Sequence, residues 1–290
     1  MDIKGLIDCH THCKFSPDGR DEPSELVKSA QQLGLKAIAI TDHCECNTWF
    51  EPEHYGIDSR KADADDIIMY NCKSFHLASI QPMKELVRQS FGELAVIHGV
   101  ELGQPLQAPE IADEIVGDEE LDFVIGSLHN NSGMLDFYYL RFDEMSPQQI
   151  NSLLGDYFEQ VLQMCQWGAF DILGHLTYPL RYICGKYNIS VDTDCYKDTI
   201  VQIFKTLISD NKGIEINTSG LFTDLKKTMP DAKLVKLYRE LGGEIISIGS
   251  DAHCAEDVGR GAALGAELAR ECGFDRAAYF IKHKPVFVKL

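Results

Sequence analysis

Residues 8–19 read DCHTHCKFSPDG, and this stretch places two histidines, His10 and His12, where a short apolar run ends. The run, Leu6–Cys9, has the length and the apolar character of a strand that is buried on both faces. Residues two apart in a strand point to the same side, so His10 and His12 can face one site. The opening of the chain therefore predicts a buried strand that carries a pair of ligands at its carboxyl end.

Six further apolar runs repeat this arrangement. They are Ala37–Thr41, Ala95–Val100, Phe123–Leu128, Ile172–Gly174, Ile214–Ile216 and Ile245–Ile248. Segments of helical period separate most of them, and the first such helix is expected to open at Glu22-Pro23 and to close at Gly34. Alternating strands and helices predict right-handed crossovers and a parallel sheet. We expect one α/β domain over residues 1–290, because no repeat and no linker rich in Pro, Gly or Ser divides the chain.

Polar side chains end nearly every one of these runs. They are His10, His12, His43, Glu101, His129, His175, Asn217, Asp251 and His253. In a closed parallel barrel all the strands end at one mouth, so residues far apart in sequence converge there. An open doubly wound sheet brings together only the strands at its switch point. The pattern therefore favours a closed barrel.

The chemistry of these side chains predicts a hydrated metal site. Asp251 and His253 form a second pair two residues apart, and imidazoles mixed with carboxylates suit zinc, manganese or iron. No cysteine stands at the matching positions, which argues against a structural zinc site. The six histidines, Glu101, Asp251 and Asp18 exceed what one ion of four to six ligands can use. We therefore expect at least two ions.

Two connections, 44–91 and 175–191, exceed ordinary loop lengths and are expected to carry lid or substrate elements. Arg181 lies in the second, in TYPLRY, and its guanidinium suits a pair of phosphate oxygens or a surface salt bridge. Asp42 is adjacent to His43 and should point differently. This position suits either a hydrogen bond that orients a ligand imidazole or the cap of a turn.

The composition limits the classes of partner that the protein can bind. The 290 residues include 27 Lys and Arg against 45 Asp and Glu, and the net charge of −18 argues against a nucleic acid partner. We expect a cytoplasmic protein without a membrane partner, because no apolar run approaches about 18 residues and the start lacks a secretory pattern. The ten cysteines include no CxxC pair and are expected to be reduced. The sequence does not indicate an oligomeric state.

Taken together, the motifs resemble those of the polymerase and histidinol phosphatase (PHP) family of metal-dependent phosphoesterases, and most of all its histidinol-phosphate phosphatases. The matching motifs are DCHTHCKFSPDG, ITDHCE at Ile40–Glu45, HGVELG at His98–Gly103, GSLHN, DILGHL, EINTSGL at Glu215–Leu221 and IGSDAH at Ile248–His253. The resemblance spans nearly the entire chain.

This resemblance implies a distorted (β/α)7 barrel with a site for three divalent ions, zinc, manganese or iron, at the strand carboxyl ends. Carried over by motif, His10, His12, Glu101 and Asp251 would hold the first ion. Glu101 would bridge to a second ion held by His129 and His175. The third ion would use Asp18, His43 and His253.

The implied activity is hydrolysis of a small phosphomonoester, L-histidinol phosphate, to L-histidinol and phosphate in histidine biosynthesis. Two ions that share Glu101 would activate a water to attack phosphorus, while Arg181 neutralises charge on the phosphoryl oxygens. Asp18, His253 or a water on the third ion would then protonate the leaving alcohol.

The chain departs from the family pattern at one point. An arginine that grips phosphate often follows EINTSGL, whereas this chain continues Phe222-Thr223-Asp224. Lys226 or Lys227 is the expected substitute, and Asn217 is a further candidate for substrate binding.

Three alternatives stay open. The first is a PHP phosphoesterase that acts on nucleotides or sugar phosphates. The second is an amidohydrolase barrel, which also begins with HxH but commonly bridges its metals with a modified lysine; Glu101 at the end of the third strand disfavours it. The third is a metal-binding module without catalysis, which the intact ligands at every motif disfavour.

Overall fold

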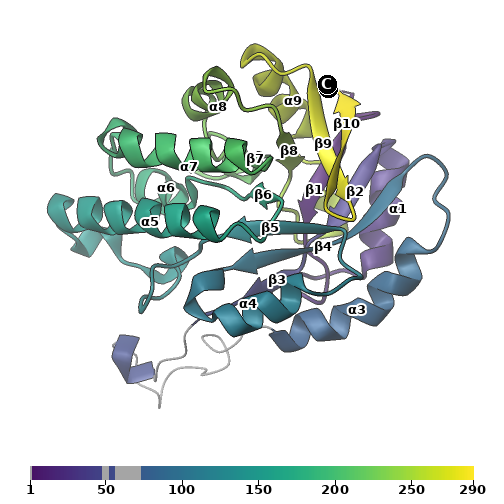
Figure 1. Cartoon of the computed structure of the whole chain (residues 1–290), viewed down its shortest axis with the longest axis horizontal. Helices are drawn as coiled ribbons and strands as arrows, with labels where there is room; N and C mark the ends of the chain where they lie inside the picture. The colour runs from purple at the N-terminus through teal and green to yellow at the C-terminus, as the bar shows by residue number, and fades with distance from the viewer. Residues whose placement is uncertain (1, 48–51, 56–72) are drawn as a thin grey trace.

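The computed structural model describes residues 2–47, 52–55 and 73–290 (Figure 1). The middle of the long 44–91 connection, a candidate lid, lies outside these ranges. None of the helices in the described ranges is both long and apolar enough to cross a membrane. Every described cysteine is a free thiol, as the sequence predicts.

Seven parallel strands form the central sheet, and each corresponds to one of the predicted apolar runs. They are β1 (Ile7–Thr11), β2 (Ala37–Ile40), β4 (Ala95–Gly103), β5 (Phe123–Ser127), β6 (Ile172–Leu173), β7 (Gly213–Asn217) and β8 (Ile246–Gly249), paired in this order. A further short strand, β3 (His43–Glu45), pairs with β4 beyond the end of β2. The sequence analysis did not predict β3, because three polar and sulfur-containing residues carry no strand period.

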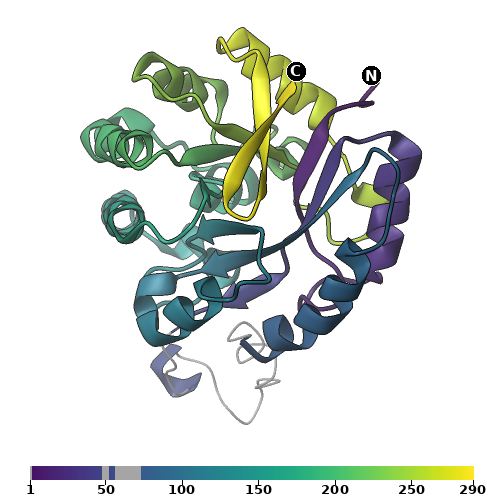
Figure 2. The ribbon, with the colours of Figure 1, turned by 45° about the vertical axis from the view of Figure 1, so that its right-hand side comes forward.

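The sheet curls until its first and last strands meet. Beyond β8, Ala252 forms a parallel bridge with Thr11 of β1. The backbone N–H of His12 donates to the Ala252 carbonyl at 2.7 Å, and that of Asp251 donates to the His10 carbonyl at 2.8 Å. The ring of elements is visible in Figure 2. The expectation of a distorted (β/α)7 barrel is confirmed.

Helices cover the outside of the barrel. They are α1 (Pro23–Leu33), α3 (Lys73–Val87), α4 (Pro109–Val116), α5 (Pro147–Trp167), α7 (Lys197–Ser209), α8 (Ala232–Glu240) and α9 (Ala262–Glu271). The predicted limits of α1 are confirmed: Pro23 occupies its first turn, and Gly34 ends it in the left-handed conformation with φ 70°. After β6 the chain forms the short helix α6 (Tyr178–Leu180) and a π-helical turn, Arg181–Lys186.

A buried set of hydrogen bonds ties β1 to the loop after β8. The carboxylate of Asp8 accepts hydrogen bonds from the Ser250 N–H at 2.8 Å, the Ser250 hydroxyl at 2.5 Å and the Gly259 N–H at 2.7 Å. Asp8 itself is fully buried. This contact fixes the position at which the barrel closes.

The C-terminal segment forms an antiparallel hairpin that the sequence analysis did not predict. Its strands are β9 (Arg276–Ile281) and β10 (Lys284–Lys289). The His283 N–H donates to the Asp122 carbonyl at 2.9 Å, and the His283 ring lies 2.9 Å from the Asp171 carboxylate. Asp122 and Asp171 immediately precede β5 and β6, so the hairpin crosses the amino ends of the strands. The other end of the barrel, at the carboxyl ends, carries the candidate site.

Candidate metal centre

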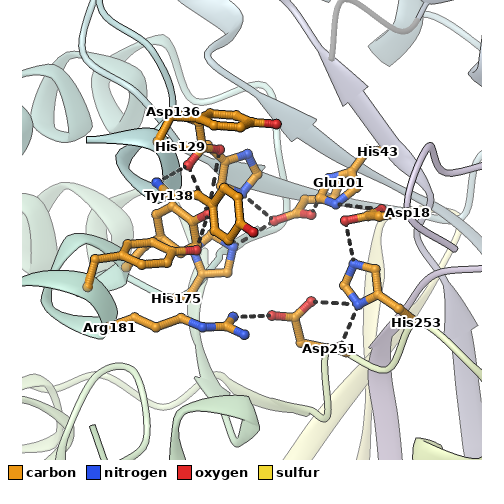
Figure 3. A pocket seen from close by; sticks show the side chains of 13 residues that line it. Asp18, His43, Glu101, His129, Asp136, Tyr138, His175, Arg181, Asp251 and His253 are labelled. Carbon is orange, nitrogen blue, oxygen red and sulfur yellow. Dashed lines mark hydrogen bonds and ion pairs between the residues drawn. The ribbon is translucent and has the colours of Figure 1, made fainter. Parts of the chain in front are cut away.

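Glu101, on β4, occupies the centre of the barrel mouth, with its side chain 1% exposed. Its Oε1 lies 2.7 Å from Nε2 of His175 and 3.1 Å from Nε2 of His129. Its Oε2 lies 3.3 Å from Nε2 of His10 and 2.8 Å from Nδ1 of His43. One carboxylate therefore contacts imidazoles that come from four different strands or strand ends, and Figure 3 shows three of them, His43, His129 and His175.

The opening histidine pair lies beside Asp251. Asp251 Oδ1 is 3.4 Å from Nε2 of His12 and 3.8 Å from Nε2 of His10, and both rings point to the same side of β1. Asp251 follows β8 and adopts the left-handed conformation with φ 58°, which Asp tolerates better than most residues. The first and last strands of the barrel therefore contribute to one cluster.

A third group lies toward the solvent side of this cluster. Asp18 Oδ2 is 3.2 Å from Nε2 of His253, and Asp18 Oδ1 is 3.8 Å from Nε2 of His43. The His12 ring stacks between His43 and His253, at centroid distances of 4.2 and 4.3 Å. All the residues that the motifs suggest as ligands thus converge on one region.

Two buried glutamates in this region were missed by the sequence analysis. Glu45 lies 2.9 Å from Nδ1 of His129, and Glu215 lies 2.7 Å from Nδ1 of His10. The other Glu215 oxygen accepts the His175 N–H at 2.8 Å. Each glutamate stands two residues from a polar strand-end residue, and that spacing in a buried strand was the signal available.

Asp42 organises the loop after β1. Its carboxylate accepts hydrogen bonds from the Cys13 N–H at 2.7 Å and the Ser16 hydroxyl at 2.9 Å. The same Ser16 oxygen lies 3.1 Å from Nδ1 of His12 and accepts the His43 N–H at 3.0 Å. Of the two interpretations of Asp42, the structure therefore shows a loop cap that acts on the imidazoles through Ser16.

The pattern of unused atoms fits a metal site. Nε2 of His10, Nε2 of His12 and Oε2 of Glu101 are buried and, although the two nitrogens lie 3.3 and 3.6 Å from that oxygen, make no well-aligned hydrogen bond among the described residues. The opposite ring nitrogens are held by Glu215 and Ser16. An imidazole with one nitrogen held and the other free is typical of a metal ligand.

Four groups of residues bring their ligand atoms within 4.8 Å of one another. They are His10, His12 and Asp251; His10, Glu101 and His175; His12, His43 and His253; and His43, Glu45 and His129. The described residues therefore form several overlapping groups that can hold metal ions.

The protonation states of Glu101 and His12 are those of metal ligands. Burial raises the pKa of Glu101, but His10, His129 and His43 together hold it well below its usual value. Burial, with His43 and His253 nearby, lowers the pKa of His12 to about 3. Glu101 is therefore an anion and His12 is neutral near pH 7, which are the forms that bind metals. Burial lowers the pKa of His10, His43 and His129, but the surrounding carboxylates raise it well above its ordinary value, so these three rings would release protons on binding an ion.

A cavity of about 570 Å³ opens over the cluster and reaches solvent at the barrel mouth. Arg181, on the π-helical turn after β6, lines it and points Nη1 toward Asp251 Oδ2 at 3.7 Å (Figure 3). The volume lies within the usual range for small-molecule sites.

The remaining substrate-binding candidates lie elsewhere. Asn217 is buried beside the cluster, where its Nδ2 lies 3.5 Å from Asp251 and its Oδ1 accepts from Ser219. Lys226 and Lys227 are exposed and are not among the residues that line the cavity. Lys227 pairs instead with Asp231 at 3.5 Å.

Comparison with known protein families matches residues 8–219 to the PHP domain. The chain belongs to the PHP family. The matched range holds the candidate ligands from His10 to His175, and the resemblance inferred from the motifs is confirmed.

Two PHP proteins illustrate the likeness in sequence. The chain is 29% identical over 261 residues to a probable histidinol-phosphatase of Thermotoga maritima, covering 88% of each chain. It is 25% identical over 281 residues to the histidinol-phosphatase of Lactococcus lactis subsp. lactis, covering 94% of each.

One solved structure illustrates the likeness in fold. It is histidinol phosphate phosphatase from Lactococcus lactis subsp. lactis, complexed with zinc, L-histidinol and phosphate. The TM-score is 0.70 at 24% sequence identity, with 97% of this chain and 98% of that chain covered.

Proposed function

We propose that this PHP protein is a metal-dependent phosphomonoester hydrolase that converts L-histidinol phosphate and water to L-histidinol and phosphate. The observation that carries the proposal is Glu101, a buried carboxylate that four imidazoles contact at the floor of a cavity lined by Arg181. The histidinol-phosphatase names of relatives at 25–29% identity over most of the chain support the choice of substrate.

We assign three divalent ions to the centre: zinc, as in the Lactococcus lactis structure, or manganese or iron. The first would be held by His10, His12, Glu101 and Asp251. The second would share Glu101 and use His129 and His175, and the third would use Asp18, His43 and His253. The four overlapping groups of ligand atoms support a centre with more than one ion.

Divalent ions in such a centre supply Lewis acidity at phosphoryl oxygens and lower the pKa of water from about 15.7 toward about 7. Side chains of the protein orient the groups that take part in the reaction. Glu215 and Glu45 hold the Nδ1 atoms of His10 and His129, so that each Nε2 faces Glu101. Arg181, with its guanidinium in the cavity, would bind phosphoryl oxygens and stabilise the charge that develops on them.

The alcohol that leaves in this reaction must gain a proton. Asp18 and His253 lie on the opposite side of the cavity from the helical turn that carries Arg181 (Figure 3). Burial lowers the pKa of His253, but Asp18 and Asp251 raise it above its ordinary value overall. We propose that this side of the cavity delivers the proton to the alcohol oxygen, from Asp18, His253 or a water held there. Arg181, rather than Lys226 or Lys227, is our candidate for phosphate binding.

We propose that residues 1–290 work as a single domain with a small-molecule substrate. One continuous apolar core includes residues from Leu6, just before β1, to Phe280 on β9, which supports this view. The cavity of about 570 Å³ suits a small phosphomonoester.

Phosphate release is the decisive assay. We expect release from L-histidinol phosphate in the presence of zinc or manganese, slower release from a generic aryl phosphate, and none after chelation. Nucleotides serve as the competing substrates, because they test the rival PHP phosphoesterase.

Each rival predicts a different result. Phosphate release from nucleotides alone would show that a nucleotide, rather than L-histidinol phosphate, is the substrate. Cleavage of an amide or a cyclic imide without cleavage of any phosphoester would favour the amidohydrolase. Bound metal without any hydrolysis would favour a non-catalytic module.

A further inference from the structure

The cavity has a second wall that the metal centre does not use. Four tyrosines form it, and we refer to them as the tyrosine wall: Tyr138, Tyr139, Tyr178 and Tyr182. Asp136 lies among them and is the one carboxylate of the cavity lining outside the candidate ligand set. In the view of Figure 3, Asp136 and Tyr138 lie on the side of the cavity opposite Asp18 and His253.

Asp136 has neutral hydrogen-bond donors. It accepts the Tyr138 N–H at 2.7 Å and the Tyr178 hydroxyl at 3.2 Å, and the Tyr182 hydroxyl donates to that of Tyr178 at 2.9 Å. In the part of the chain that the structure describes, no Lys, Arg or His nitrogen forms an ion pair with it. Burial raises the pKa of Asp136 to about 6, so near neutral pH its carboxylate carries a charge that a cation would stabilise.

The tyrosine wall connects Asp136 to the metal centre. The Tyr178 ring lies 4.9 Å from the His129 ring and 5.0 Å from the His175 ring, while its hydroxyl contacts Asp136. One tyrosine therefore spans from two candidate ligands to Asp136. A small ester with its phosphate beside Arg181 and its ester oxygen toward Asp18 and His253 would leave the carbon chain of its alcohol to extend along this ring.

The rings themselves favour a positive charge. Tyr182 lies edge-on to Tyr178 at 5.3 Å, and Tyr138 lies edge-on to Tyr182 at 6.0 Å. Aromatic faces attract cations within about 6 Å. At the outer end of the wall Lys186 already lies 5.6 Å from the Tyr138 ring, whereas Asp136 faces the cavity.

We propose that Asp136, with Tyr138, Tyr178 and Tyr182, forms a cation-binding subsite that selects phosphomonoesters of alcohols bearing a protonated nitrogen. This inference rests on the proposed phosphatase function and names the residue that determines its specificity. Asp136 would bind the nitrogen through its charge, and the tyrosine rings would exclude water from that contact.

A purely structural role of Asp136 can be separated from this one. Asp136 also caps the short turn Phe137–Tyr139 through the Tyr138 N–H. Asparagine caps such turns as well as aspartate, so Asp136→Asn keeps the cap and removes the charge. Asp192 offers a matched control, because it caps the turn Thr193–Tyr196 through the Asp194 N–H at 3.0 Å.

The test compares three esters: L-histidinol phosphate, aminoethyl phosphate and hydroxyethyl phosphate. The last two differ in one charged group. We expect the wild-type protein to prefer the amino ester. Asp136→Asn should raise KM for both cationic esters about tenfold, because one charged contact is lost. KM for hydroxyethyl phosphate, and kcat for all three esters, should stay nearly unchanged. Asp192→Asn should change none of these values.

The outcomes are distinct. Equal preference of the wild-type protein for the amino and hydroxy esters, an unchanged KM in Asp136→Asn, or a parallel loss with all three esters would overturn the subsite. If wild-type protein cleaves aminoethyl phosphate but not histidinol phosphate, the proposed substrate fails while the amino and hydroxy pair still decides the subsite. Cleavage of none of the esters would refute the proposed function and the subsite with it.

Discussion

Glu101 shows how much of the site depends on one side chain. Both of its oxygens are shared among imidazoles, and its anionic state is maintained by those imidazoles against the effect of burial on its pKa. A neutral amide at this position would offer one oxygen in place of two and would carry no charge.

We therefore expect Glu101→Gln to lose at least one equivalent of bound metal and to lower kcat by about a hundredfold or more. Removing partners outside the ligand shell already costs about 10–100-fold in metal sites, and Glu101 contacts the ligands directly. Elemental analysis and phosphate release measure the two effects. Glu110→Gln, on the exposed face of α4, is the control. Full metal content in Glu101→Gln would contradict the bridging role.

At the scale of single residues, sequence predicted the histidines and acids that strand ends bring together. It did not predict Glu45 and Glu215, because their role depends on which imidazole each one reaches across the sheet. It also did not predict Asp136, which lies in an irregular loop where no period indicates the direction of a side chain. Arg181 was predicted because it follows His175 closely.

At the scale of elements, the hydrogen bonds of Asp8 to the loop after β8 fix the position at which the barrel closes. Asp8→Ala would leave two buried N–H groups, of Ser250 and Gly259, without an acceptor. We expect a loss of about 3 kcal/mol in the free energy of unfolding, since each such group costs about 1–3 kcal/mol.

Urea unfolding of the chelated protein measures this effect separately from metal binding. Asp2→Ala, at an exposed position near the start of the chain, is the matched control. A loss of less than about 1 kcal/mol in Asp8→Ala would mean that water replaces the carboxylate and that the closure does not depend on it.

The hairpin is held by a contact that titrates. Its hydrogen bond to Asp171 raises the pKa of His283, so the stabilisation is complete below the ordinary histidine pKa and is lost as pH rises through the raised value. The His283 side chain is 40% exposed, which limits the effect to about 0.2–1 kcal/mol.

We expect His283→Asn to lower Tm at about pH 5.5 and to have little effect at about pH 9. Asparagine tolerates the positive φ of 59° at this position, so the turn is retained. Lys282→Asn, at the neighbouring turn position, should shift Tm equally at both pH values, because lysine stays charged throughout this range. A pH-independent effect of His283→Asn would refute the ionic contact.

The seven strands of the barrel were predictable because each is a short apolar run buried on both faces. The hairpin β9–β10 was not, since only partly buried residues alternate with exposed ones in β10 and the hairpin lies outside the alternation of strands and helices. Strand β3 was missed because its residues are chosen for the site rather than for strand propensity.

At the scale of the whole molecule, the candidate ligands extend from His10 on the first strand to His253 beyond the last. Metal ions bound there would link both ends of the sheet. An ion that binds the folded protein alone and is present at a thousand times its Kd stabilises by about 4.1 kcal/mol.

We therefore expect a chelator to lower Tm by about 10 °C and added zinc or manganese to restore it. Differential scanning calorimetry measures the shift, with calcium as the control because it prefers oxygen ligands. An unchanged Tm after verified removal of metal would show that the barrel closes without help from the centre.

Barrel closure itself was predictable, because ligand residues end nearly every strand and only a closed sheet gathers them. The tyrosine wall was not, because its residues come from two loops whose packing no local pattern encodes.

The hairpin across the amino ends of the strands bears on how substrate and products reach and leave the cavity. With the far end of the barrel covered, substrate enters and both products leave by the mouth. Glu101 is nearly inaccessible, whereas Tyr138 is 55% exposed, so an alcohol on the tyrosine wall would lie nearer the opening than its phosphate. If the alcohol occupies the tyrosine wall and the phosphate lies near Glu101, we expect the alcohol to leave first and inorganic phosphate last.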